Sequence, residues 1–195
     1  MRAETYTACG TESFACLAPA LREQIARVKM LILDVDGVLT DGGLYYVPEG
    51  HIAKRFNVQD GFGIQIARQS GLHLAVVTGQ DQPSVAARMR DLCIEDYFPG
   101  CVHKREALDA LCRKRGVSRE EIAFLGDDWI DLSILEVVGV PLAVANAVPE
   151  VLRTALYITG RSGGDGAVRE AIRLILYCKG TLDAALAGWM AKHNP

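Results

Sequence analysis

The chain alternates short apolar runs with longer amphipathic stretches over most of its length. Short apolar runs bounded by turn-forming or acidic residues are typical of buried strands. They predict strands at residues 30–34, 72–78, 121–126, 141–145 and 156–159, with a shorter one near residue 97. Apolar residues at helical spacing predict helices at residues 20–28, 61–69, 83–93, 105–115, 130–138, 148–155 and 166–178.

The alternation of strands with helices predicts the α/β class, with a Rossmann-like parallel sheet covered by helices on both faces. No repeat, low-complexity tract or linker interrupts the pattern. We therefore expect one main domain at residues 30–180, with an arm and a helix at residues 1–29 before it and a tail at residues 181–195 after it. Ligands of such folds bind beyond the carboxyl ends of the strands, so candidate site residues should follow the strands.

The segment LYYVPEGHIAKRFNV, residues 44–58, breaks the alternation. Its two β runs around a Pro-Glu-Gly turn predict a β-hairpin, here called the flap, inserted just after the first strand of the domain. The chain between residues 36 and 78, and again between residues 78 and 104, has room only for the flap and single helices and strands. We therefore expect no separate cap domain.

Composition and charge narrow the classes of function. The chain has 195 residues, a net charge of −3 at pH 7 and six cysteines. A small negative charge gives no general attraction to nucleic acid or anionic lipid, so we expect neither as a partner. The cysteines form no CxxC pair, which argues against a zinc site or a disulfide framework and favours reduced thiols in the cytoplasm. The sequence shows no signal-peptide pattern and no apolar run of membrane-spanning length.

Three aspartates follow the first predicted strand of the domain, in the sequence LILDVDGVLTDG at residues 31–42. Asp34, Asp36 and Asp41 lie among glycines in a segment here called the acidic loop, residues 34–42. Carboxylates that lie close together repel one another unless a cation, a proton or water separates them. The acidic loop is therefore either a hydrated surface turn or a site for a positive charge.

Other predicted strands also deliver polar residues at their carboxyl ends. These residues are Thr78, Gly79, Lys104, Asp127, Asp128 and Asp131. Taken singly, each has a structural explanation, such as a surface turn, a solvated lysine or acidic residues that cap the following helix. Together, in this order and each after a strand, they favour a catalytic site.

The order DxDG, TG, Lys and GDDxxD resembles that of the haloacid dehalogenase superfamily of phosphatases, and the resemblance covers nearly the whole chain. It implies that Asp34 is the nucleophile, which forms an acyl phosphate and divides the hydrolysis into two steps. It implies that Asp36 protonates the leaving alcohol and then takes a proton from the attacking water. Asp34, the backbone carbonyl of Asp36 and Asp127 are then the oxygen ligands of Mg²⁺.

The same resemblance implies supporting roles for the remaining motif residues. Lys104 offsets negative charge on the nucleophile and the phosphoryl group. The Thr78 hydroxyl and nearby backbone N–H groups, with Gly79, bind the phosphoryl oxygens. Asp128 and Asp131 stand behind the metal ligands and orient Lys104 or the waters of the metal.

Longer stretches narrow the resemblance to one subfamily. LILDVDGVLTDGGLYY, RFNVQDGFGI, AFLGDDWIDLSIL and GGDGAVRE are together similar to the 3-deoxy-D-manno-octulosonate 8-phosphate phosphatases, which release an eight-carbon sugar acid for lipopolysaccharide synthesis. The resemblance implies a capless homotetramer in which the flaps meet and the region after Gly180 reaches an adjacent site. It also implies substrate contacts at Asn57 and Gly61, in addition to Thr78, Gly79 and Lys104.

Two positions depart from the subfamily pattern. Gln59 and Gln80 stand where enzymes for the eight-carbon substrate commonly carry arginine, and glutamine cannot supply the charge with which arginine binds a carboxylate. Two alternatives therefore stay open: a phosphatase for a nine-carbon sugar acid 9-phosphate of the sialic-acid type or another small phosphate ester, and a non-catalytic scaffold. The other candidates for an anion contact, each of which also suits a solvated surface, are Lys54, Arg55, Arg68 and Arg161.

Overall fold

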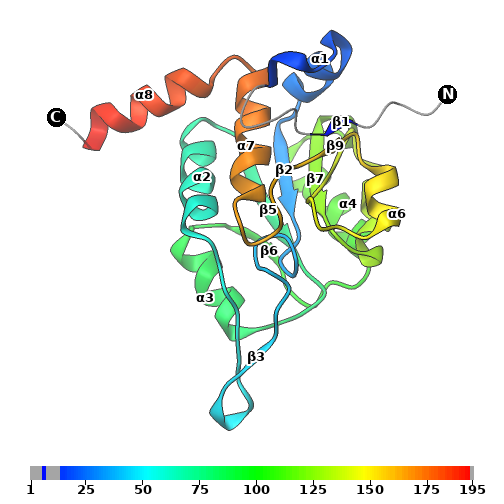
Figure 1. Ribbon diagram of the computed structural model, residues 1–195, viewed down its shortest axis with the longest axis vertical. Coiled ribbons are helices and arrows are strands. Elements are labelled where there is room, and N and C mark those ends of the chain that lie inside the picture. Colours follow the sequence, from blue (N-terminus) through cyan, green and yellow to red (C-terminus); the bar gives the residue numbers. More distant parts are fainter. Residues whose placement is uncertain (1–5, 8–13, 194–195) are drawn as a thin grey trace.

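The fold is built on a seven-stranded parallel sheet, seen in a computed structural model that describes residues 6–7 and 14–193 (Figure 1). Across the sheet the strands run in the order β1-β9-β8-β7-β2-β5-β6. Their bounds are Tyr6–Thr7 for β1, Met30–Leu33 for β2, His73–Val77 for β5, Asp96–Phe98 for β6, Ile122–Gly126 for β7, Val140–Ala143 for β8 and Tyr157–Ile158 for β9. Most of the predicted arm, with Cys9, lies outside the described residues.

Each strand predicted from an apolar run is present, and the predicted α/β class is confirmed. The central strand β2 pairs in parallel with β5 on one side and with β7 on the other. Leu33 at the end of β2 is level with Val76 of β5 and Leu125 of β7. The residues that follow these three strands therefore meet at one edge of the sheet, where parallel folds bind ligands. β1 pairs with β9 and was not predicted, because a two-residue strand carries no sequence period.

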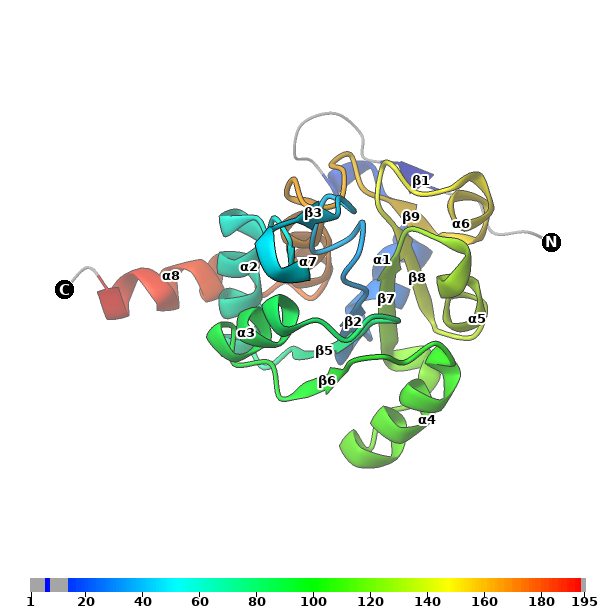
Figure 2. The same ribbon diagram turned by 90° about the horizontal axis from the view of Figure 1, so that it is seen from below.

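Helices cover both faces of the sheet, as predicted. α1 and α2 pack against α7 on one face, and α4, α5 and α6 form a row on the other (Figure 2). None of the helices in the described part of the chain is long and apolar enough to cross a lipid bilayer. The helices are α1 (Pro19–Ala26), α2 (Val58–Gln69), α3 (Pro83–Asp91), α4 (Lys104–Arg115), α5 (Leu132–Leu135), α6 (Pro149–Thr154), α7 (Ala167–Cys178) and α8 (Leu182–His193).

Some helix ends differ from the prediction for local reasons. α2 begins at Val58 rather than residue 61, because the Asn57 side chain accepts a hydrogen bond of 2.7 Å from the Gln59 backbone N–H and so caps the helix. The helix predicted at residues 130–138 is divided into a 3₁₀ turn at Trp129–Asp131 and the short α5. α4 ends as expected at Gly116, whose φ of 64° is readily adopted by glycine.

The flap is a two-stranded antiparallel hairpin that projects beyond the body of the molecule (Figure 1). Its strands are β3 (Tyr45–Tyr46) and β4 (Ile52–Ala53), joined through a 3₁₀ turn at Pro48–Gly50 as the sequence predicted. At its base, an isolated antiparallel bridge joins Thr40 to Phe56. On β4, the Ser84 hydroxyl of α3 donates to the Ile52 carbonyl at 3.2 Å. Both contacts fix the flap to the body near the ends of β2 and β5.

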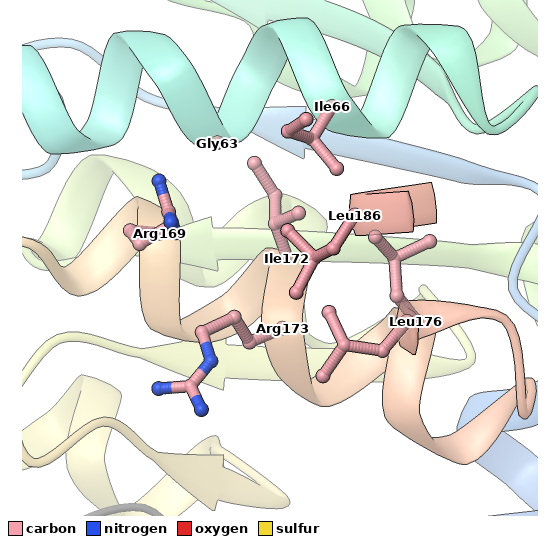
Figure 3. Close-up of a pocket in the computed structure, with 8 residues that line it drawn as sticks. Gly63, Ile66, Arg169, Ile172, Arg173, Leu176 and Leu186 are labelled. Carbon is pink, nitrogen blue, oxygen red and sulfur yellow. The ribbon is translucent and has the colours of Figure 1, made fainter. Parts of the chain in front are cut away.

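The region after Gly180 forms helix α8, where the sequence analysis expected only a tail. α8 extends away from the sheet and is held mainly by Trp189, whose ring lies edge-on to Phe62 of α2 with centroids 4.8 Å apart. Leu182 and Leu186 close a cavity of about 30 Å³ between α2, α7 and α8 (Figure 3). No residue of α8 is buried, so this helix is only loosely packed on the body in the single chain.

Candidate active site

The acidic loop begins where β2 ends, and it delivers Asp34 into a nearly closed space between neighbouring strand ends. The Asp34 side chain is buried, and its backbone N–H continues the sheet by donating to Leu125 of β7 at 3.2 Å. Thr78 is likewise buried and follows β5, on the other side of β2. Asp127 follows β7. The parallel register therefore brings three of the predicted site residues to one edge.

Lys104 lies at the first position of α4, and its side chain is completely buried. The Lys104 ammonium donates to Asp34 Oδ1 at 2.8 Å and to Asp131 Oδ1 at 2.5 Å. A buried ammonium needs such partners, because an isolated charge in a low-dielectric interior is very costly. The predicted contact between Asp131 and Lys104 is present in this geometry.

Asp131 uses both carboxylate oxygens within the protein. Its Oδ1 accepts from Lys104, and its Oδ2 accepts from the backbone N–H groups of Asp127 at 2.9 Å and Asp128 at 3.4 Å. Asp128 instead caps the turn after β7, where its side chain accepts from the Trp129 backbone N–H at 2.7 Å. The helix-capping explanation of the acidic motif thus fits both residues, which form a capping box, and Asp131 also orients the buried lysine.

Asp127 has an unused donor atom for a cation. Its Oδ1 is buried and has no hydrogen-bond partner among the residues that the structure describes, although buried carboxylate oxygens are normally paired. Its other oxygen packs against Gly37, where a Cβ atom would lie only 2.0 Å from Asp127 Oδ2. Gly37 also has φ of 81°, so both the backbone angle and the close approach require glycine.

The electrostatics of the cluster also favour a cation. Burial, followed by repulsion from Asp131, raises the pKa of Asp34 to about 7 despite the opposing effect of Lys104. Burial, followed by repulsion from Asp34 and Asp131, raises the pKa of Asp127 to about 8. Oxygen atoms of Asp34, Asp127 and Asp131 lie within 4.8 Å of one another. Three carboxylates with one lysine leave negative charge that a divalent cation would balance.

The residues present fit a hard divalent ion with oxygen ligands. Asp131 is already engaged by Lys104 and by two N–H groups, so Asp34 and the unpartnered Asp127 Oδ1 are the better side-chain ligands. The sequence analysis expected these two ligands together with the backbone carbonyl of Asp36, and metal binding by these groups stays a prediction.

Asp36 lies two residues after Asp34 on the turn, where its side chain is 28% exposed. Its described ion-pair partner is Lys54 of the flap, whose ammonium contacts Asp36 Oδ1. The third acid of the loop, Asp41, belongs to the flap base, since its carboxylate accepts from the Tyr45 hydroxyl at 2.6 Å. That hydrogen bond holds the pKa of Asp41 below its usual value. The acidic loop therefore divides its charges between the site and the flap.

The Lys54 contact is the site feature that sequence reasoning missed. Lys54 stood there as one of four basic residues suited to an anion or to solvent. The signal was the alternation along the strand, because Ile52, Lys54 and Phe56 share one side and are less exposed than Ala53 and Arg55 between them. A lysine on the inward side of the flap is expected to pair with a negative charge on the body of the protein, because an unpaired buried ammonium is costly.

The other predicted substrate residues lie nearby and already have structural contacts. Gly79 follows Thr78, and a Cβ there would lie 3.2 Å from the Ile130 side chain. Asn57 caps α2, and its amide also donates to the Gly164 carbonyl at 3.3 Å. Gly61 lies against the Arg88 guanidinium, which a Cβ would approach to 2.3 Å. Substrate contacts at these three residues stay predictions.

Comparisons with known proteins agree with this geometry. Residues 93–172 match the family model of the haloacid dehalogenase-like hydrolases. The chain is 40% identical over 179 residues to 3-deoxy-D-manno-octulosonate 8-phosphate phosphatase KdsC of Escherichia coli K12, an alignment that covers 90% of this chain and 95% of that protein.

Solved structures of phosphatases are also similar to this chain. The 3-deoxy-D-manno-octulosonate 8-phosphate phosphatase of Moraxella catarrhalis, in complex with a magnesium ion, a phosphate ion and a KDO molecule, superposes with a TM-score of 0.84 at 36% identity, over 87% of this chain and 98% of that one. The cobalt-bound deoxy-D-mannose-octulosonate 8-phosphate phosphatase of Haemophilus influenzae gives a TM-score of 0.80 at 37% identity, over 83% and 94% of the two chains.

We expect Mg²⁺ to stabilise the protein against heat, because a cation in the cluster relieves the repulsion between Asp34 and Asp127. A ligand at one hundred times its dissociation constant adds about 2.7 kcal/mol to the free energy of unfolding. For a chain of this size each kcal/mol raises Tm by about 2–4 °C, so the expected rise is roughly 5–10 °C. Thermal melts in EDTA and in excess Mg²⁺ measure it.

Asp127→Asn separates the metal effect from general stabilisation. In EDTA the variant should melt at or above the wild-type temperature, since asparagine carries no charge that the neighbouring carboxylates can repel, and it should lose most of the rise with Mg²⁺. Asp183→Asn on the exposed surface of α8 is the control and should keep the full rise. A variant at position 127 that melts earlier in EDTA and still responds fully to Mg²⁺ would contradict this assignment.

Proposed function

The chain belongs to the 3-deoxy-D-manno-octulosonate 8-phosphate phosphatases of the haloacid dehalogenase-like hydrolases, and on this premise we propose that it hydrolyses 3-deoxy-D-manno-octulosonate 8-phosphate to the free sugar acid and phosphate. The observation that carries the proposal is 40% identity over nearly the full length of both proteins. The buried meeting of Asp34, Lys104 and Asp131 supports it, because it assembles the predicted chemistry in one place. The enzyme class is phosphoric monoester hydrolase.

In the first step a carboxylate oxygen of Asp34 attacks phosphorus, and the bond from phosphorus to the sugar oxygen breaks. Asp36 gives a proton to that oxygen, so that the sugar acid leaves as an alcohol. In the second step water attacks the aspartyl phosphate, Asp36 takes the proton of the water, and phosphate leaves with Asp34 restored. Asp36 is suited to both transfers by its partial exposure and its place two residues from the nucleophile.

Lys104 has two roles in this scheme. It holds Asp34 through Oδ1 and neutralises part of the negative charge that the phosphoryl group brings to a buried site. Asp131 keeps the lysine in place from the opposite side. The Thr78 hydroxyl, which accepts from the Gln80 backbone N–H at 3.3 Å, can direct its own hydrogen toward a phosphoryl oxygen.

The cofactor is a divalent metal, and we propose Mg²⁺. Solved relatives hold magnesium in one case and cobalt in another. The ligand set here is carboxylate and carbonyl oxygen, which suits Mg²⁺ better than softer ions. When bound, the ion polarises a phosphoryl oxygen and offsets its charge.

The eight-carbon substrate is compatible with Gln59 and Gln80, because other cations lie close to both. Lys54 Nζ is 3.3 Å from Gln80 Oε1. Gln59 lines an open pocket of about 650 Å³ together with Arg55 and Arg161, next to the flap base. Lys54 and Arg55 are already paired with Asp36 and Asp165, so these cations offset the two missing arginines only in part. The nine-carbon alternative has no such specific support beyond the two substitutions themselves.

We further propose that the enzyme is a homotetramer in which neighbouring flaps meet, and that it works in the cytoplasm. The flap supports the first proposal, since Leu44, Tyr46 and Val47 are exposed there and a lone hairpin gains little stability in water. Four cysteines support the second proposal, because Cys93, Cys101, Cys112 and Cys178 are free thiols, as expected in a reducing compartment.

A panel of phosphate esters tests the substrate. We expect phosphate release from 3-deoxy-D-manno-octulosonate 8-phosphate with a kcat/KM at least about tenfold above that for a nine-carbon sugar acid 9-phosphate, a difference of about 1.4 kcal/mol in transition-state binding. Initial rates with Mg²⁺ give the comparison. The reverse preference would move the enzyme to the nine-carbon class, and a protein inactive on every ester would favour the scaffold.

Asp34→Asn should lower kcat by roughly a thousandfold or more, because an amide oxygen is a poor nucleophile toward phosphorus. The variant should keep its fold, since asparagine has nearly the same shape and can still accept from Lys104. Circular dichroism and the melting temperature check the fold, and phosphate release checks activity. If the variant released phosphate at the wild-type rate, Asp34 could not be the nucleophile.

Asp36→Asn should impair the release of a sugar alcohol far more than the release of p-nitrophenolate, which leaves without a proton. We expect a loss of roughly a hundredfold or more on the sugar ester and a clearly smaller one in the burst of p-nitrophenolate from p-nitrophenyl phosphate. Rapid-mixing measurements separate that burst from the later hydrolysis of the aspartyl phosphate. Equal losses on both substrates would count against Asp36 as the acid.

A further inference from the structure

Lys54 is placed by the extended backbone of the flap between two anchors on the body. Side chains alternate along the strand, so Lys54 points inward with Ile52 and Phe56. The Ile52 carbonyl accepts from the Ser84 hydroxyl of α3 at 3.2 Å, and Phe56 pairs with Thr40 of the acidic loop. The residue between these two anchors has little freedom to move independently of the site.

The Lys54 side chain is completely buried, an unusual state for the long cationic side chain of a hairpin that projects from the protein. Its ammonium contacts Asp36 Oδ1 and lies 3.3 Å from Gln80 Oε1. Gln80 is joined in turn to Thr78, because its backbone N–H donates to Thr78 Oγ1 at 3.3 Å. One chain of hydrogen bonds therefore connects the flap, the proposed general acid and the proposed phosphate-binding threonine.

A purely structural explanation accounts for part of this arrangement. Charged residues that point inward are one way in which exposed hairpins avoid pairing with other strands. That role needs only a positive charge on the flap, and a solvated ammonium would serve it. It does not require a lysine whose side chain is buried with its ammonium on the one carboxylate that the reaction needs as an acid.

We propose that Lys54 is a positioning residue that holds Asp36 for proton transfer to the leaving oxygen. This inference rests on the proposed phosphatase function and deepens it. An ammonium donates hydrogen bonds and cannot accept one. Because Oδ1 accepts from Lys54, Oδ2 is the oxygen that this proposal assigns to proton transfer.

The arrangement also fixes the carboxyl group. Asp36 is partly exposed and follows a strand on a turn that continues through Gly37, so its side chain would otherwise sample several rotamers. A group held at one oxygen presents the other in a constant direction, and a displacement of about 1 Å can cost a hundredfold in rate. The flap thus contributes to the chemistry through Lys54 as well as covering the site.

The variant Lys54→Met tests the role, since methionine fills a similar volume without the charge, and the partly exposed Asp36 regains water. We expect kcat on the sugar ester to fall by about ten- to a hundredfold, with the burst of p-nitrophenolate from p-nitrophenyl phosphate reduced by less than about threefold. Lys54→Arg should recover part of the loss, because it restores a cationic donor. Lys29→Met, which removes an exposed lysine paired with Glu121, is the matched control and should leave both rates unchanged.

A double mutant shows whether Lys54 acts through Asp36. If it does, Lys54→Met combined with Asp36→Asn should be no slower on the sugar ester than Asp36→Asn alone, because the second change removes nothing further. Multiplied losses in the double mutant, equal losses on both esters in the single one, or an unchanged kcat for Lys54→Met would each overturn the proposal. Wild-type protein that hydrolyses neither ester would instead refute the phosphatase function itself, and melting temperatures confirm that every variant is folded.

Discussion

The site depends on how the fold tolerates several carboxylates close together in a buried space. Asp34 and Asp131 share the buried ammonium of Lys104, and Asp131 additionally accepts from two backbone N–H groups. An ammonium without those partners would be very costly to bury, as would the carboxylates without the ammonium. Asp127 Oδ1, by contrast, has no hydrogen-bond partner in the described residues. The ion pairs of Lys104 with Asp34 and Asp131 therefore fix the position of the nucleophile, and Asp127 Oδ1 remains available to bind a metal ion.

Close backbone contacts hold the acidic loop over this cluster. The loop before α7, in the sequence RSGGDGAVRE, packs directly on the acidic loop. A Cβ at Gly163 would lie 1.6 Å from the Gly37 carbonyl oxygen, and one at Gly164 would lie 2.4 Å from the Asp41 nitrogen. Glycine is needed at these positions because the two backbone segments touch. The segments are far apart in the sequence, so their contact cannot be predicted from a local sequence pattern.

The parts of the structure that sequence could predict are those with a local cause. Strand positions follow from apolar runs, and the meeting of Asp34 with Asp127 follows from the rule that parallel strands end at one edge. The contact between Lys54 and Asp36 forms only because the flap folds back over the acidic loop, and the hydrophobic pattern of the sequence does not predict the direction in which a hairpin folds. α8 was missed in a similar way, because its packing on α2 and α7, through residues such as Leu182 and Trp189, is what distinguishes it from an unstructured tail.

The flap shows why a site without a cap domain still needs a cover that carries chemistry. An isolated two-stranded hairpin is marginally stable, and here Tyr46 is 74% exposed on its outer side. The inner side is held by Ser84 and by the bridge to Thr40, with the buried Lys54 between them. Any contact that steadies the outer side, such as a neighbouring flap in the proposed tetramer, would also steady Lys54 and through it Asp36. Assembly and proton transfer would then be coupled by the rigidity of one short strand, without a conformational signal passing through the core.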